Sequence, residues 1–452
     1  MKHKKRRFET LSFYDHTGIE HHLTNMAKQG WLIEKISNYY WTYRKIEPCD
    51  LTFMVTYFPK ASDFDPQLSE EQERLRDFCA DTGWELACTW FQMQVFYNES
   101  EDPIPINTDP VLEVEAVHKA CKASLLKGYY VLIAISGIMS FFFLSSLISD
   151  TLRILASPTD MFKGIIWLLL LILILVEVLT YFRWYRKAKK QAEHEIFLET
   201  PSTAKFQKIA MGLLVIFLLN WILNIVLVDN PVLLWCCALV AVVIILDHIL
   251  IQVVKNHLKK KNVSANMNKA LTILFSFVFV FVMMGTVVYG SLRFFEDQIR
   301  ENLPYKAMEA PLYMEDLVHQ DSDYVAYLTQ TDYEESTILS MMKVTERRSF
   351  DEKDDQSVAM TYQRYLVKTP LLYDFCEGQL QRLMVLSEYW KGELLETDAA
   401  SWNADRVYRL VLDNGTETNR YLLCYDHVLV DIQFNWSPTP EQMAIVSEAL
   451  SK

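Results

Sequence analysis

The sequence predicts a membrane protein: an α-helical bundle of five transmembrane helices, flanked by an N-terminal α+β cytoplasmic domain and a C-terminal α+β extracytoplasmic domain. Two observations lead to this fold class. Residues 1–127 hold 15 basic and 20 acidic side chains, residues 128–292 hold 14 and 8, and residues 293–452 hold 15 and 29. The middle third, which is basic, also contains five long apolar stretches. The overall net charge of −13 argues against a nucleic-acid partner.

Each apolar stretch has about the 20 residues that a helix needs to cross a bilayer with its backbone hydrogen bonds satisfied. The expected spans are residues 128–148, 164–182, 209–228, 231–254 and 270–292. The third and fourth are separated only by the turn signal Asp229-Asn230-Pro231. We therefore expect these two spans to form a helical hairpin.

The orientation follows from the positions of lysine and arginine, which stay on the cytoplasmic side of a bilayer. Seven basic residues lie between the second and third spans, and five lie between the fourth and fifth. By contrast, two lie between the first and second spans, and none lies between the third and fourth. This pattern places residues 1–127 in the cytoplasm and residues 293–452 outside. Phe182, Trp184 and Tyr185 follow the second span, where an aromatic belt is expected.

The N-terminal domain has its expected core at about residues 8–98 and contains a short internal repeat. Residues 25–33 align with residues 78–86, so that Gly30 matches Gly83. Each copy is typical of a helix, a glycine that ends it with φ > 0, and then a strand. The first residues, Met1 to Arg7, are basic and are interpreted either as a solvated tail or as a patch attracted to anionic lipid.

Aromatic strands surround this repeat and give the order helix-β-β-β-helix-β. The motifs are Met26-Ala-Lys-Gln-Gly-Trp31, Tyr40-Trp-Thr-Tyr-Arg-Lys45, Leu51 to Tyr57, Thr82-Gly-Trp-Glu-Leu86 and a last strand from Trp90 to Tyr97. In these motifs the region of about residues 8–98 resembles the bacterial domain-of-unknown-function family 2812. The resemblance implies a bacterial, cytoplasm-facing module that often precedes membrane helices. It implies no established activity and therefore no catalytic residue.

One cluster in this domain has side chains that can bind metal: Asp15, His16, Glu20, His21 and His22. Neighbouring helical positions such as His21 and His22 face different directions, so both cannot easily bind one ion. We expect ordinary helix-start or surface chemistry there, without a metal or other cofactor.

The C-terminal domain is expected to be α+β. Strand patterns lie at residues 323–329, 406–412, 420–424 and 428–434, and helical patterns at residues 378–390 and 440–450. Cys376 and Cys424 are its two cysteines, and an oxidising exterior would allow either one disulfide or two buried thiols. The acidic run Asp351 to Asp355 lacks the spacing of a calcium loop and is expected to be solvated.

Polar residues within the spans are the remaining candidates for function, because a charge in hydrocarbon is unfavourable by at least about 2.5 kcal/mol. They are Glu177, Asn220, Asn224, Asp247 and His248. Glu177 lies near the cytoplasmic end, where it is expected to reach Arg183 or water. We expect these residues mainly to hydrogen-bond neighbouring helices, with a polar pathway as the alternative.

The sequence has no phosphate-binding loop, HExxH or GxSxG motif, and only 12 glycines. The leading hypothesis is a non-enzymatic multi-pass protein of the bacterial cell membrane that acts as a sensor, regulator or interaction scaffold. Its partners would be the lipid bilayer and an unidentified protein. The alternative is a transporter or transporter accessory subunit. An unrecognised membrane enzyme comes third, and it would need Glu177, Cys236, Asp247 and His248 to converge.

Overall fold

The computed structural model describes residues 4–37, 40–227, 231–294, 309–318, 326–349, 357–387 and 390–452. They form two compact units, each described here by itself. Unit 1 is Met1–Met139, Ile166–Leu219 and Asp229–Phe294, and unit 2 is Ser140–Ile165, Asn220–Val228 and Phe295–Lys452. The expected turn at 229–230, the first residues of the expected strand at 323–329 and the acidic run at 351–355 lie outside the described residues.

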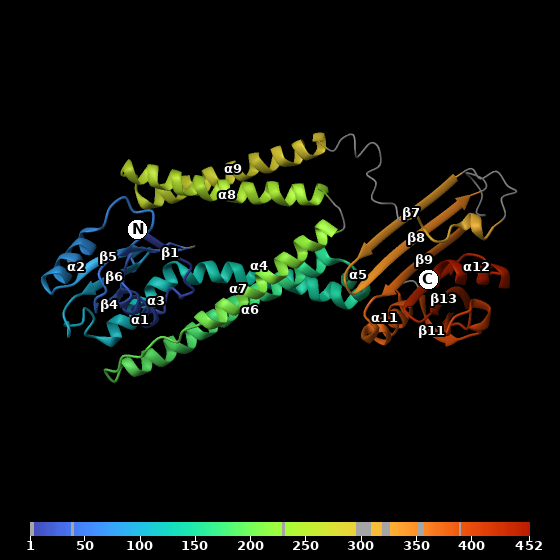
Figure 1. Ribbon diagram of the computed structural model, residues 1–452, viewed down its shortest axis with the longest axis horizontal. Coiled ribbons are helices and arrows are strands. Elements are labelled where there is room, and N and C mark those ends of the chain that lie inside the picture. The colour runs from blue at the N-terminus through green and yellow to red at the C-terminus, as the bar shows by residue number, and fades with distance from the viewer. Residues whose placement is uncertain are drawn as a thin grey trace. The chain divides into compact units, whose positions relative to one another are not determined.

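The N-terminal domain contains three helices and two three-stranded antiparallel sheets (Figure 1). The sheets have the strand orders β1-β3-β2 and β4-β6-β5. The helices are α1 (His16–Lys28), α2 (Glu70–Asp81) and α3 (Pro110–Ala123). The strands are β1 (Lys4–Arg7), β2 (Trp31–Lys35), β3 (Trp41–Lys45), β4 (Thr52–Tyr57), β5 (Glu85–Trp90) and β6 (Met93–Asn98).

The two glycines of the internal repeat have the same backbone conformation, as their positions predict. Gly30 lies between α1 and β2, Gly83 lies between α2 and β5, and both have φ +82°. This left-handed conformation lets each chain reverse after the helix and enter a strand. At Gly30 an added Cβ would also lie 3.0 Å from the carbonyl oxygen of Ile46, so the close approach requires glycine as well.

The fold differs from the expected order at two places. The basic start is not a tail, because Lys4–Arg7 pairs with β3, Lys5 lies over the Trp31 ring and Arg6 over the Tyr40 ring. The expected last strand at 90–97 is a hairpin of β5 and β6, which reverses at Phe91 with φ 51°. The aromatic run through this turn hides it from a pattern based on hydrophobic alternation.

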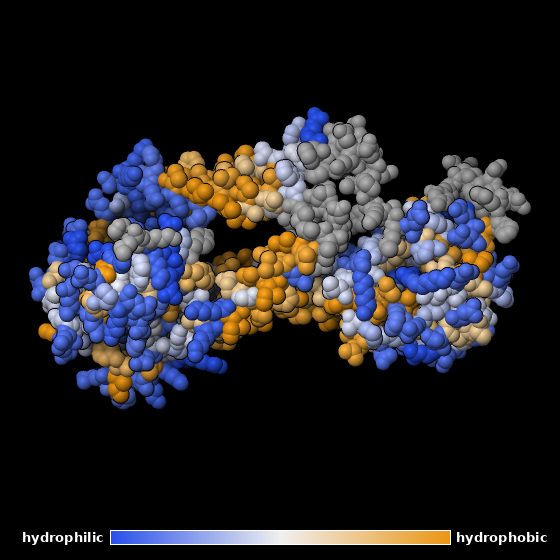
Figure 2. Space-filling model, in the orientation of Figure 1, coloured by the Kyte–Doolittle hydropathy of each residue, from blue (hydrophilic) through white to orange (hydrophobic). Residues whose placement is uncertain are grey.

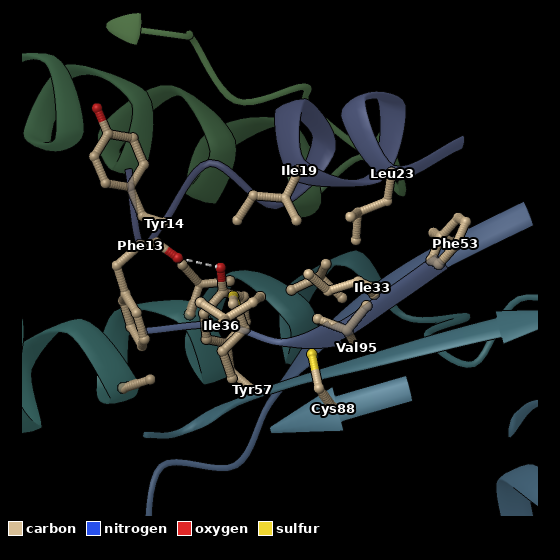
Figure 3. Close-up of a cluster of buried hydrophobic side chains, with 14 of the residues drawn as sticks. Phe13, Tyr14, Ile19, Leu23, Ile33, Ile36, Phe53, Tyr57, Cys88 and Val95 are labelled. Atoms are coloured by element: carbon tan, nitrogen blue, oxygen red, sulfur yellow. Dashed lines mark hydrogen bonds between the residues drawn. The ribbon is translucent and has the colours of Figure 1, made fainter. Parts of the chain in front are cut away.

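The core of the N-terminal domain lies between α1 and the strands. Figure 3 shows Ile19 and Leu23 of α1 pointing toward Ile33 and Val95, and all four side chains are buried. The Tyr57 hydroxyl donates a hydrogen bond to the Phe13 carbonyl oxygen (2.5 Å), which ties the chain before α1 to β4.

Among the described residues, five helices are long and apolar enough to cross a membrane. They are α4 (Leu125–Ser149), α6 (Pro158–Ala192), α7 (Ala204–Leu227), α8 (Pro231–Lys260) and α9 (Ala265–Phe294). Figure 2 shows hydrophobic residues concentrated along these helices and hydrophilic residues over the two β-containing domains. Helix α6 continues to Ala192, beyond the expected end of the second span at residue 182, and this extension becomes part of the N-terminal domain's core.

The C-terminal domain is built on one eight-stranded antiparallel sheet with the order β10-β11-β12-β13-β14-β9-β8-β7. Its strands are β7 (Ala326–Glu335), β8 (Leu339–Ser349), β9 (Ser357–Val367), β10 (Leu386–Ser387), β11 (Trp390–Glu396), β12 (Arg406–Leu412), β13 (Glu417–Cys424) and β14 (Val428–Phe434). Its helices are η1 (Met314–Asp316), η2 (Pro370–Leu372), α11 (Tyr373–Val385), η3 (Ala400–Trp402) and α12 (Pro440–Leu450). The sheet is larger than expected. The sequence patterns did not predict β8, β9 and β11, because no clear turn signals surround them.

Each face of this sheet is covered by different elements. Alternate residues of β8, β9, β13 and β14 point to a core with α12 on one face and to a core with α11 on the other. The second core also includes α5 (Thr151–Ala156), the short helix between α4 and α6. Leu152 and Ala156 of α5 are fully buried there, and Ser336 Oγ donates a hydrogen bond to the Leu155 carbonyl oxygen (2.7 Å).

Candidate functional site

A set of buried and partly buried polar side chains joins the N-terminal domain to α6 and to the segment that leads into α7, all within unit 1. We call this set the polar junction. It consists of Ser12, Asp15, Thr17, Glu177, Thr200, Thr203 and Gln207. Its residues come from three segments far apart in the sequence, so its hydrogen bonds depend on how the N-terminal domain is seated on these helices.

Glu177 is the centre of one half of the polar junction and is only 2% exposed. Thr203 Oγ1 donates a hydrogen bond to its Oε2 (2.6 Å), and Gln207 Nε2 donates another (3.1 Å). Both donors also contact Ser12 Oγ, at 2.9 Å from Thr203 Oγ1 and 3.1 Å from Gln207 Nε2. Instead of the expected contact with Arg183, Glu177 therefore contacts the start of α7 and, through Thr203 and Gln207, is linked to Ser12 of the N-terminal domain.

Asp15 is the centre of the other half and is fully buried at the start of α1. Its Oδ1 accepts hydrogen bonds from Gly18 N (3.1 Å) and from Thr200 Oγ1 (2.6 Å). Thr200 N in turn donates to Thr17 Oγ1 (2.9 Å). Gly18 is required here because an added Cβ would lie 2.5 Å from the Asp15 carboxylate oxygens. The capping residue of α1 thus also holds the segment before α7.

Three buried oxygens at this place have no hydrogen-bond partner among the described residues: Tyr14 Oη, Asp15 Oδ2 and Glu177 Oε1. Burial, together with the negative charges of Glu177 and Asp15, raises the pKa of Tyr14 well above its usual value, so its hydroxyl stays neutral. A buried, unpaired carboxylate oxygen is unfavourable. The hydrogen-bonding groups of the polar junction are therefore satisfied only in part, so a small structural change can alter the stability of this contact.

A pair of titratable residues on α1 lies beside the polar junction. His16 Nε2 is 3.2 Å from Glu113 Oε1 of α3, and although burial lowers the pKa of His16, the contact with Glu113 raises it above its ordinary value. Glu20 Oε1 accepts a hydrogen bond from Val55 N (2.8 Å). Burial raises the pKa of Glu20 to about 7. The N-terminal domain therefore has a half-buried carboxyl group, that of Glu20, whose raised pKa lies near neutral pH.

Aromatic side chains connect this region to α6. The Tyr14 and Tyr181 rings lie 5.2 Å apart, and the His16 and Trp184 rings lie 6.0 Å apart. Trp184 is 3% exposed and belongs to the core of the N-terminal domain. The expectation that Trp184 forms part of a lipid-facing aromatic belt is therefore wrong.

A second contact joins the N-terminal domain to α8 and α9. Lys255, at 8% exposed, forms an ion pair with Asp63, and the Asn268 amide donates to the carbonyl oxygens of Phe64 and Lys255 (3.2 Å each). The N-terminal domain thus contacts the segment before α7 and the ends of α8 and α9 that flank their connecting turn.

Among the other polar residues expected within the spans, Asp247 has a described partner on a neighbouring helix. Asp247 Oδ2 accepts a hydrogen bond from Ser276 Oγ of α9 (3.1 Å), which links α8 to α9 as expected for a packing contact. Asn220 lies on α7, and His248 follows Asp247 on α8. The side chains of Asn224 and Cys236 lie outside the described residues.

The candidate metal residues point to separate partners. His16 pairs with Glu113, while His22 Nε2 lies 3.2 Å from Glu9 Oε1 and 3.1 Å from the Tyr43 hydroxyl. In the part of the chain that the structure describes, no three His, Cys, Asp or Glu side chains are placed to hold a metal ion.

Cys376 and Cys424 are free thiols in the structure, which is the second of the two expected alternatives. Both are buried in the core that contains α5. Burial raises the pKa of Cys376 to about 11 and, together with the charge of Glu377, that of Cys424 to about 12. Both thiols therefore stay protonated and unreactive while this core is intact.

Comparison with known proteins gives one match. Residues 15–128 match the model of the family described as "Protein of unknown function (DUF2812)", in agreement with the resemblance of the N-terminal region. No curated protein and no solved structure matches the chain. The matched region contains α1 and α3, and thus Asp15, Thr17, His16 and Glu113 of the site described above.

Proposed function

We propose that this chain is a multi-pass protein of the bacterial cell membrane, with its N-terminus in the cytoplasm and its C-terminal domain outside, and that it acts non-enzymatically as a sensor, regulator or interaction scaffold. Five helices of sufficient length and apolarity support the membrane location. The seven and five basic residues in the second and fourth connections support the orientation.

One observation carries this proposal: among the described residues, the contacts of each folded domain include connections that five crossings would put on its own side. The N-terminal domain contacts the segment between α6 and α7, through Thr200 and Thr203, and the ends of α8 and α9, through Lys255 and Asn268. The C-terminal domain contacts the connection between α4 and α6, through Leu152 and Ala156. In the proposed topology, an odd number of crossings lies between these two groups of contacts.

The same contacts support a regulatory role. The N-terminal domain is joined to α6, α7, α8 and α9 by hydrogen bonds and an ion pair, so a partner that binds this domain and alters its seating would act directly on the helices. Such a signal requires two arrangements that differ in their contacts. The partly satisfied polar junction is the element best suited to have them.

Reporter fusions test the topology. A fluorescent protein that folds in the cytoplasm should be active at the N-terminus and inactive after residue 452, and an exported phosphatase should show the reverse. The same activity pattern at both ends would contradict the proposal.

Affinity purification tests the role. With the full chain in detergent, cross-linking from each face should recover a specific protein partner, and recovery with the N-terminal domain as bait should fall for Asp15→Ala. If neither face yields a partner, and the purified protein instead moves a solute into liposomes, the alternative function as a transporter would replace this proposal.

A further inference from the structure

We propose that the exposed side of α11 rests on the outer surface of the lipid bilayer, with Leu371 and Phe375 entering the boundary between headgroups and acyl chains. This inference rests on the proposed function, because it requires α4 and α6 to cross the membrane. It adds a lipid-contacting surface to a domain whose composition indicates only a water-soluble fold.

The position of α5 fixes where α11 lies. One residue, Asp150, separates α5 from α4, and one residue, Ser157, separates it from α6. If α4 and α6 cross a bilayer, α5 must therefore lie at the membrane surface. Helix α11 packs on α5, because Leu152 and Ala156 share one core with Cys376, Leu380 and Met384 (Figure 1). Packed helices have axes about 8–10 Å apart, so α11 also lies near this surface.

Large apolar side chains are exposed at the start of α11 and in the short helix η2 directly before it. Leu371 of η2 is 93% exposed, and Phe375 of α11 is 46% exposed. Phe375 lies in the first turn of α11, about opposite Leu380 and Met384. Large apolar side chains with this exposure at the membrane surface are unfavourable in water and favourable in the interfacial region of a bilayer.

An exposed basic residue continues the same side. Arg382 follows Phe375 by seven residues, or about two helical turns, and is exposed. A guanidinium group binds phosphate oxygens well, and lipid headgroups carry phosphate. An apolar residue followed by a cation along one side of a helix, with a second exposed apolar residue directly before that helix, fits a segment that lies in a membrane surface. These observations favour lipid over a protein partner as the occupant.

Spin labelling of the full chain tests this inference. In a Cys49→Ser, Cys236→Ala, Cys237→Ala background, the variants Leu371→Cys and Phe375→Cys would each be labelled with a nitroxide. The protein would be placed in nanodiscs of phosphatidylethanolamine and phosphatidylglycerol. We expect the labels at both positions to collide more often with oxygen, which dissolves in lipid, than with a water-soluble nickel chelate.

Two control positions distinguish a failure of this inference from a failure of the proposed function. Leu395 is as exposed as Phe375, at 46%, but its neighbour Leu394 packs on the α11 core, so Leu395 points to the other face of the sheet. Its label should favour the nickel chelate. Phe141 of α4 is 69% exposed and should favour oxygen, because it lies within an expected span.

Each outcome has one meaning. Nickel accessibility at both 371 and 375, with oxygen accessibility at 141, would overturn this inference and leave the proposed function intact. Labels at 371 and 375 that are immobile and accessible to neither reagent would also overturn it, because a protein surface would then cover α11. Nickel accessibility at 141 would instead overturn the proposed function.

Discussion

The two folded domains hold the connections between the long helices by different chemistry. The N-terminal domain uses the polar junction, in which Asp15 and Glu177 accept hydrogen bonds from threonine and glutamine side chains. The C-terminal domain uses an apolar junction, which we define as Leu152, Leu155 and Ala156 of α5 packed among Leu339, Met341, Cys376 and Leu380.

This difference indicates which contact can respond to conditions. Hydrogen bonds depend on geometry and on protonation, and a buried polar group without a partner is unfavourable. Apolar packing depends on little except shape and area. The N-terminal contact is therefore suited to a conformational change, and the C-terminal contact is suited to remain intact. A buried thiol lies at each contact: Cys121 lies near the polar junction, and Cys376 lies in the apolar junction. The rate at which a thiol reagent labels each cysteine therefore reports how often the surrounding core opens.

The largest expected effect comes from Leu152→Ala in the apolar junction. Removing this fully buried side chain leaves a cavity and should destabilise the C-terminal core by about 2–5 kcal/mol. Thiol labelling of Cys376, identified by mass spectrometry, should become faster by roughly 30-fold or more, since about 1.4 kcal/mol is tenfold. Arg153→Ala, at an exposed position of the same helix, should leave the rate nearly unchanged. Equal rates for the two variants would mean that α5 is not part of this core.

Thr203→Val should have a smaller effect, on the polar junction alone. It removes a hydroxyl donor from Glu177 and the contact with Ser12, and a lost hydrogen bond to a buried charged group weakens stability by about 1–3 kcal/mol. Cys121 should react faster while Cys376 does not. Thr203→Ser keeps the hydroxyl and should behave like the wild type. If Thr203→Ser and Thr203→Val react alike, the hydroxyl has no energetic role.

A change of pH should separate the two domains further. The native pKa of Glu20 is raised from 4.5 to about 7, so the folded state favours the protonated carboxyl. The stabilisation from this group is complete below about pH 4.5 and is lost as the pH rises through about 7, at no more than roughly 1.4 kcal/mol per pH unit. The labelling rate of Cys121 should therefore increase relative to that of Cys376 as the pH rises through about 7, after both rates are corrected for the fraction of thiolate. Glu20→Gln should abolish the difference, and its persistence in that variant would assign it to another group.

The smallest expected effect is that of salt. Added salt screens the ion pair between Lys255 and Asp63, whose side chains are 10% and 37% exposed, by less than about 1 kcal/mol. The apolar junction has no such pair at its centre and should not weaken. Comparing Cys121 labelling at low and high salt in the wild type and in Asp63→Asn tests this, and an equal salt effect in both would exclude the ion pair as the cause.

Local patterns predict much of this fold. The five apolar stretches become five long helices, Gly30 and Gly83 take the left-handed conformation, and the helical pattern at residues 440–450 becomes α12. These features depend on residues close in sequence. The eight-stranded sheet was predicted only in part, because β8 and β9 lack sharp turn signals and β9 pairs with β14, which is far along the chain.

The polar junction was predicted only at Glu177. Its partners Ser12, Thr17, Thr200 and Thr203 are ordinary surface residues by type, and only the tertiary fold brings them together. Asp15 caps α1 by accepting a hydrogen bond from Gly18 N, but this local pattern does not indicate its second contact, with Thr200. A buried polar network of this kind has no fixed spacing in sequence, so no motif search would find it.

Helix α5 also determines how the C-terminal domain can be made. The ribosome synthesises Leu152 and Ala156 long before the strands that surround them, so this core closes only when the growing chain returns to a helix that was made much earlier. A recombinant fragment starting at residue 293 would lack both side chains and would have a hole at its centre. Soluble production of this domain therefore requires a fused copy of residues 150–157.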